Sequence, residues 1–89
     1  QVCALVESCG ADGAAVLSLR NKFAVGDELE LVGPGVRPTA FTVPDMTDGG
    51  GLPLLEARKP EMKLHMRLPV PVPPLSLLRR RVQAQGAAQ

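Results

Sequence analysis

The chain has 89 residues, enough for one small domain, and 45% of them are hydrophobic, as in an ordinary globular protein. Only Phe23 and Phe41 are aromatic, so the core must consist mainly of Val, Leu, Ala and Met, and nucleic-acid bases would find almost no aromatic surface for stacking. The formal net charge is +1, and no apolar run approaches the roughly 18 residues of a membrane-spanning helix, so no membrane contact is expected.

The first elements predicted along the chain are two strands joined by a turn. Residues 2–8 alternate loosely between apolar and polar side chains, and residues 14–20 form a second alternating segment. Residues 9–13 between them are rich in Gly and Asp, which favour tight turns. Two such segments joined by a short Gly/Asp loop are typical of a β-hairpin.

Both cysteines belong to this first segment. Cys3 falls within the first predicted strand and Cys9 at its end. Six residues of extended chain span up to ~20 Å, whereas a disulfide needs Cα atoms within about 7 Å of each other, so no Cys3–Cys9 disulfide is expected. Because the chain has a single histidine and no Cys-x-x-Cys pair, it has too few ligands for a metal site. We therefore expect reduced thiols, no cofactor in this chain and a cytoplasmic location.

The run over residues 20–35, RNKFAVGDELELVGPG, is the most ordered part of the sequence. Gly26 can adopt a positive φ without steric cost, and Asp27 can hydrogen-bond its own local backbone, so the two predict a corner. An alternating strand follows at residues 28–32, and Gly33-Pro34 stops it. The residues expected to enter the core are Phe23, Val25, Leu29 and Leu31.

The rest of the chain also predicts short strands separated by Gly and Pro. Expected are a strand at 39–43, a short edge strand at 45–47, a glycine turn at 48–51, a weak strand at 52–57, a strand at 62–68, a surface polyproline II segment at 69–74, a last strand at 75–81 and a frayed tail at 82–89. Six to eight such strands predict an all-β fold, a small antiparallel β-barrel or sandwich, with residues 2–81 as one domain.

No catalytic site is predicted within the chain. Asp27 is interpreted as a turn residue, and Glu28 and Glu30 as the solvated face of a strand. His65 shares a strand face with basic residues, and no serine lies in the Gly-x-Ser-x-Gly setting of a hydrolase nucleophile. The glycines at 49–51 are followed by no Lys-Ser/Thr, which excludes a phosphate-binding P-loop.

The net charge hides an asymmetry between the two parts of the chain. Residues 1–57 hold three basic and eight acidic residues, a balance of −5, and residues 58–89 hold seven basic residues and one acidic, a balance of +6. The two parts could pair within one fold, or a basic face could meet a phosphate backbone or an acidic partner domain. Arg79-Arg80-Arg81 is the clearest basic cluster and fits either interpretation.

The residues at 20–35 also carry a family resemblance. The pattern is similar to the C-terminal β-domain of the peptidase U32 family, the collagenase-like proteases. The matching residues are Arg20-Asn21-Lys22-Phe23, Gly26-Asp27, Leu29-Glu30-Leu31 and Gly33-Pro34, with weaker likeness at Phe41-Thr42-Val43, Met46 and Leu77-Leu78-Arg79-Arg80. One departure is at Ala57-Arg58-Lys59-Pro60, which keeps the proline of a family element but lacks its histidine.

The resemblance implies a division of labour within a longer protein. In such proteins a large upstream domain resembles a TIM-type barrel and carries cysteines, which in several members bind an iron–sulfur cluster. Those members hydroxylate RNA bases or quinones, and others are described as proteases. Since the chain begins at Gln1, inside a strand pattern, we expect it to be the end of such a protein.

Our leading interpretation is a non-catalytic accessory or lid domain that covers or orients substrate for its own upstream catalytic domain. The alternatives are an RNA-binding module of an RNA-modifying member, a protein–protein docking domain, and a free-standing small hydrolase. If the substrate is RNA, the expected contacts are Arg20, Lys22, Arg79, Arg80 and Arg81. The sequence leaves the oligomeric state open.

Overall fold

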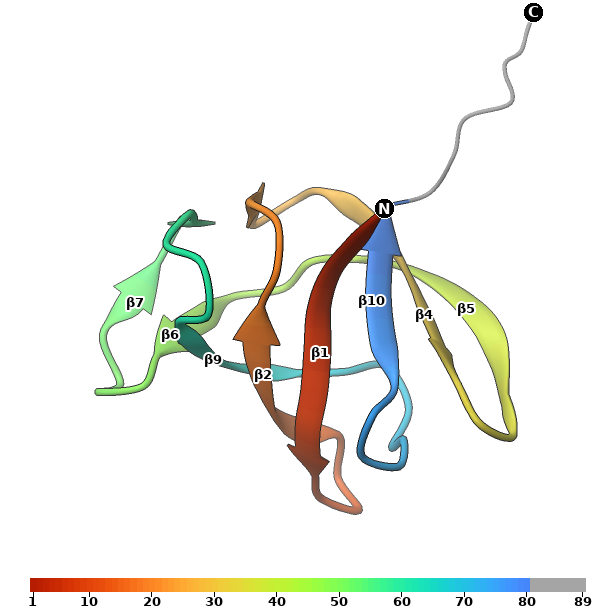
Figure 1. Ribbon diagram of the computed structural model, residues 1–89. Coiled ribbons are helices and arrows are strands. Elements are labelled where there is room, and N and C mark those ends of the chain that lie inside the picture. The colour runs from red at the N-terminus through yellow and green to blue at the C-terminus, as the bar shows by residue number, and fades with distance from the viewer. Residues whose placement is uncertain (81–89) are drawn as a thin grey trace, which may run out of the picture.

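The computed structural model describes residues 1–80, which form ten β-strands and no helix (Figure 1). The strands are β1 (Val2–Cys9), β2 (Ala14–Leu19), β3 (Phe23–Ala24), β4 (Glu28–Gly33), β5 (Val36–Thr42), β6 (Met46–Asp48), β7 (Pro53–Leu54), β8 (Glu56–Ala57), β9 (Lys63–Arg67) and β10 (Leu77–Arg80). The prediction of an all-β fold is confirmed. Within this part of the chain no helix is long and apolar enough to cross a membrane. Arg81 and the predicted tail at 82–89 lie outside the described residues.

Eight strands form one antiparallel sheet in the order β5-β4-β10-β1-β2-β9-β6-β7, and β3 and β8 pair separately. The hairpin predicted at the start is β1 with β2, and the last strand, β10, returns to lie between β1 and β4 (Figure 1). Over residues 1–80 the sheet is not closed into a barrel, because β5 and β7 stand at its two ends.

The central strand β1 contains an irregularity that increases its buried surface. Val2 pairs with Arg79 and Ala4 with Leu78, so Cys3 is an extra residue opposite β10. Such a bulge breaks the strict alternation of side chains along a strand. As a result the consecutive residues Cys3 and Ala4 are both buried, and both cysteines are free, as expected.

The core lies inside the curved sheet and is built from aliphatic side chains. Its fully buried large residues come mostly from β2, β4, β9 and β10, and include Leu17, Leu19, Leu29, Leu31, Leu64 and Leu78. Of the predicted core residues, Phe23, Leu29 and Leu31 are buried, and Val25 is partly buried against them. Phe23 reaches the core from β3, a strand too short for the sequence pattern to indicate.

The corner predicted at residues 25–27 is present and uses the expected chemistry. Gly26 has a φ of 93°, and an Asp27 carboxylate oxygen accepts the Ala24 N–H at 2.9 Å. The Gly26 N–H donates to the Val43 carbonyl at 3.0 Å, and the Val43 N–H donates to the Asp27 carbonyl at 2.8 Å. The corner is therefore tied to the end of β5, which fixes the direction in which β4 leaves.

Two expectations about the middle of the chain were wrong. The segment expected as an edge strand at 45–47 is β6, an internal strand that pairs with both β7 and β9. The weak strand expected at 52–57 is divided between β7 and β8, which belong to different sheets. Both differences arise because these strands pair with strands far away in the sequence, and local composition does not reveal such partners.

Two proline-containing segments also differ from expectation. β5 begins at Val36 and includes Pro38, which the strand tolerates because β5 is at the edge of the sheet. Val72, within the segment expected to run over the surface, is buried and packs into the core. The proline-rich segment therefore contributes a side chain to the core and does not run over the surface alone.

Gly33 is required at the end of β4 because Ser76 packs directly against its backbone. A β-carbon added at Gly33 would lie 2.8 Å from Ser76 Cβ and 3.2 Å from Ser76 Cα. Ser76 is fully buried. It cannot move easily, since its Oγ donates to the Pro73 carbonyl at 2.8 Å and its carbonyl accepts the Val6 N–H at 2.8 Å.

We expect Gly33→Ala to lower the free energy of unfolding by about 1–3 kcal/mol, the usual cost of overpacking a rigid site. Gly50→Ala is the matched control, since its added β-carbon would meet nothing closer than Asp48 Oδ1 at 3.5 Å. It should change stability by no more than about 0.5 kcal/mol. Urea unfolding of both variants checks the prediction, and equal losses would contradict it.

Candidate functional site

The start of β1 and the end of β10 lie side by side (Figure 1). A basic pocket of about 600 Å³ lies at these strand ends. Its lining residues come from the first position, the β2–β3 link, the β8–β9 link and β10: Gln1, Arg20, Asn21, Lys22, Arg58, Pro60 and Arg80. We call this hollow the basic pocket. Four of the seven lining residues are cationic and none is acidic, so the pocket favours anions.

The β2–β3 link is held against the start of β1 by backbone hydrogen bonds. The Cys3 carbonyl accepts the N–H groups of Arg20 at 2.8 Å and of Asn21 at 3.1 Å. The Asn21 side-chain amide donates to the Val2 carbonyl at 2.7 Å. Arg20 and Lys22 therefore project from a link whose backbone is fixed, although both side chains are exposed.

Arg80 forms the wall of the basic pocket from the end of β10. Its backbone N–H donates to the Gln1 carbonyl at 2.9 Å, and its Nη2 donates to the Lys22 carbonyl at 2.9 Å. Its Nη1 lies 3.6 Å from Asp27 Oδ2. The guanidinium of Arg80 thus joins the β2–β3 link to the corner at Asp27.

The other cations of the pocket are less engaged. Arg58 Nη1 lies 3.5 Å from Glu56 Oε1, but the two side chains are 71% and 48% exposed, so this pair contributes little. No carboxylate among residues 1–80 is within ion-pair distance of Arg20 or Lys22. The positive charge of these two side chains is therefore available to a ligand.

The structure brings together only part of the predicted basic set. Arg20, Lys22 and Arg80 line the basic pocket, whereas Arg79 does not. Arg79 pairs instead with Glu30 of the neighbouring strand β4, with Nη2 at 2.7 Å and Nε at 2.8 Å from Oε1. Successive strand residues point to opposite faces, so Arg79 and Arg80 could not both face the pocket. Arg81 lies outside the described residues.

Arg58 and Pro60 are pocket residues that sequence reasoning missed as site residues. Both lie in the segment at residues 57–60, where the sequence departs from the family pattern. That departure is the one sequence feature that could have marked them as site residues. The remaining motif residues have structural roles. Phe23 is buried, Gly26 and Asp27 form the corner, and Gly33 with Pro34 ends β4.

Other reactive side chains do not gather around the basic pocket. Burial raises the pKa of the Cys3 thiol above its ordinary value, and the nearby charge of Arg80 opposes this only in part. His65 is exposed on β9. No group of three His, Cys, Asp or Glu side chains in residues 1–80 could hold a metal. Since Cys3 and Cys9 lie near opposite ends of β1, these two thiols do not fit an iron–sulfur cluster.

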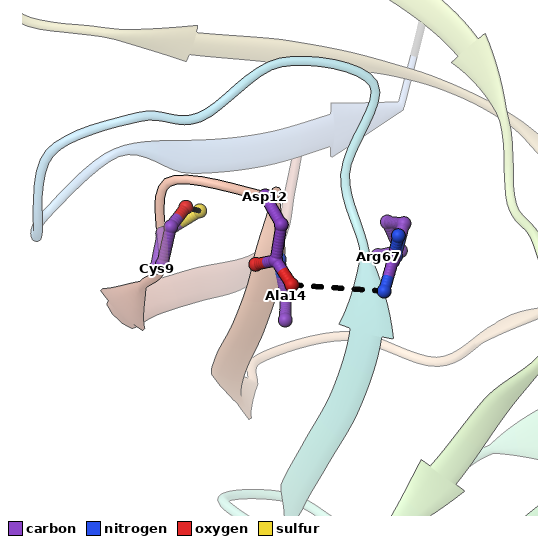
Figure 2. Close-up of polar contacts among 5 residues, drawn as sticks. Cys9, Asp12, Ala14 and Arg67 are labelled. Carbon is purple, nitrogen blue, oxygen red and sulfur yellow. Dashed lines mark hydrogen bonds and ion pairs between the residues drawn. The ribbon is translucent and has the colours of Figure 1, made fainter.

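A second polar group lies at the opposite end of β1, in the turn of the first hairpin (Figure 2). Asp12 Oδ1 accepts the Ala14 N–H at 3.0 Å, and its Oδ2 lies 3.7 Å from Arg67 Nη2 of β9. The Cys9 thiol donates to the Gly10 carbonyl at 3.5 Å. Because these contacts join neighbouring residues of a turn and the end of β9, we interpret the group as structural.

Comparison with known proteins gives a consistent family. A family model described as the peptidase family U32 C-terminal domain matches residues 1–79. The chain is similar to two crystal structures of the C-terminal domain of a Geobacillus thermoleovorans protein assigned to the U32 peptidases. One has a TM-score of 0.87 at 27% identity, covering 91% of this chain and 92% of that chain. The other, a selenomethionine variant, has a TM-score of 0.84 at 27% identity, covering 90% and 99%. No curated protein gave a match.

The hairpin turn gives a prediction about pH. The Ala14 N–H, together with the smaller effect of Arg67, holds the pKa of Asp12 below its ordinary value. A lowered pKa in the folded chain means that Asp12 stabilises the fold above its ordinary pKa, and that this contribution is lost as the pH falls through the lowered pKa.

We expect a ¹³C NMR titration of the Asp12 carboxyl to give a pKa below the ordinary aspartate value. Arg67→Ala should raise it only part of the way, because the Ala14 N–H remains. Arg37→Ala, which removes an exposed charge on β5, should leave it unchanged. An ordinary pKa in the unaltered chain would contradict the prediction.

Proposed function

We propose a role for this chain, which belongs to the family of peptidase U32 C-terminal domains. It is a non-catalytic accessory domain that positions or covers substrate for a catalytic domain preceding it. The family resemblance predicted from residues 20–35 is thereby confirmed. The match is also consistent with a longer parent protein that is a peptidase. The proposal concerns what this domain does for that parent.

The position of the basic pocket carries the proposal. Gln1 is one of its lining residues, so any polypeptide that precedes Gln1 joins this domain at the rim of the pocket. Ligand sites occur preferentially where two domains meet. A substrate bound upstream would therefore find the free cations of Arg20 and Lys22 at the junction, where they can hold an anionic part of it.

RNA binding is a second candidate function, and the same cations favour it. Lys and Arg side chains that neutralise phosphates supply most of the sequence-independent affinity for nucleic acid. With two aromatic residues in the chain, bases have little to stack on, so this binding would show little sequence preference. An RNA-modifying parent would use the domain in this way, whereas protein–protein docking has no comparable observation in its favour.

The accessory role predicts a specific kinetic effect in the longer protein. Arg20→Ala/Lys22→Ala should lower kcat/KM by about tenfold or more, mainly through KM, because a charged contact to substrate is lost (about 1.4 kcal/mol per factor of ten). Arg37→Ala/Arg67→Ala is the matched control, which removes two exposed charges outside the pocket. The 89-residue chain alone should turn over no peptide substrate, and turnover by it would contradict the proposal.

The RNA candidate predicts salt-dependent binding by the chain itself. Titration with tRNA and ribosomal RNA at two salt concentrations should give an affinity that falls steeply with salt. Removing two phosphate contacts with Arg20→Ala/Lys22→Ala should lower the slope of log K against log salt by roughly 1.5. Arg79→Ala should change binding little, because Arg79 is paired with Glu30. Equal losses in the two variants, or no binding at low salt, would remove this candidate.

A further inference from the structure

We propose that the basic pocket is a site for one phosphate-type dianion, contacted by Arg20, Lys22 and Arg58, with Arg80 as a positioning residue that does not contact the ligand. This inference rests on the proposed function, since it names the chemical class of the substrate group that the domain holds. The ligand is either free phosphate or a phosphate carried by a larger molecule, and the recognition chemistry is the same for both.

The arrangement of the cations favours a phosphate over a carboxylate. Arg20 and Lys22 project from the β2–β3 link, and Arg58 comes from the separate β8–β9 link. Cations from two segments approach a ligand from different directions. A phosphate presents acceptor oxygens in several directions and up to two charges, whereas a carboxylate presents two oxygens in one plane. A dianion also offsets the mutual repulsion of these cations, of which, within residues 1–80, only Arg58 has a carboxylate, that of Glu56, within ion-pair distance.

The guanidinium of Arg80 is already engaged by groups of the protein itself. It donates to the Lys22 carbonyl at 2.9 Å and lies 3.6 Å from Asp27. The hydrogen bond to the Lys22 carbonyl fixes the backbone from which the Lys22 side chain extends. Together with the two N–H groups bound to the Cys3 carbonyl, it preorganises the β2–β3 link, which lowers the entropic cost of binding.

The charges on the far side of Arg80 confine the anion to the basic pocket. A neighbouring hollow of about 230 Å³ shares Lys22 and Arg80 with the basic pocket but is also lined by Asp27 and Glu56. These carboxylates would repel an anion. The side chains of Lys22 and Arg80 therefore separate a hollow that attracts anions from one that does not.

The test is a ¹H–¹⁵N NMR titration of the chain with inorganic phosphate, adenosine 5′-monophosphate and acetate. Phosphate should shift the amides of residues 20–22, 58 and 80, and acetate should shift them much less. Arg20→Ala/Lys22→Ala should weaken phosphate binding at least fivefold, whereas Arg37→Ala/Arg67→Ala should not change it. Tighter binding of the nucleotide than of phosphate would identify a carried phosphate, and equal binding a free one.

Arg80→Lys tests the positioning role. It keeps the positive charge but loses the planar guanidinium that donates to the Lys22 carbonyl. It should weaken phosphate binding and move the Lys22 and Phe23 amides even without ligand, and urea unfolding would confirm that the variant is folded. Unchanged binding in Arg80→Lys would overturn the positioning role. Shifts spread over the whole surface, equal binding of acetate, or equal losses in the control pair would overturn the site. Because the titration uses no upstream domain, its failure is distinct from an unchanged kcat/KM in the longer protein.

Discussion

The basic pocket depends on the backbone carbonyl of Cys3. This carbonyl lies near the start of β1 and accepts the N–H groups of both Arg20 and Asn21. These bonds end β2 and turn the chain into the β2–β3 link, whose side chains then face the end of β10. The pocket therefore depends on how the β2–β3 link is held against the start of the central strand.

The charge asymmetry of the sequence is resolved in two ways within the one fold. All five ion pairs among residues 1–80 join a residue after position 57 to one before it, including Lys63–Glu7, Arg67–Asp12 and Arg79–Glu30. Pairing between the two parts thus accounts for most of the asymmetry. The cations left without a carboxylate at the pocket, Arg20 and Lys22, come from the net-acidic part of the chain. Summed charge located the asymmetry but did not identify which cations of the pocket lack a carboxylate partner within the described residues.

The sequence predicted best those features that local chemistry determines. The corner at Gly26 and Asp27 and the first hairpin follow from turn residues beside alternating strands, and both are present. Features that depend on distant partners were missed: β6 has a second neighbour, and Ser76 makes Gly33 necessary. The candidate site was predicted only in part for the same reason. Arg79 and Arg80 are adjacent in sequence but belong to opposite faces, and Arg58 joins the pocket from a separate link.

Fold and pocket chemistry are separable in this domain because they use different residues. The core consists mainly of buried aliphatic side chains on β1, β2, β4, β9 and β10. A domain of this size has only a small margin of stability to lose. Arg20, Lys22 and Arg58 lie outside that core with exposed side chains, where charge substitutions usually change stability by less than about 0.5 kcal/mol. Arg80 is the exception, since it ties the β2–β3 link to the corner at Asp27. A change at Arg80 therefore acts on both the local backbone and the pocket, whereas changes at the other three cations act on the pocket alone.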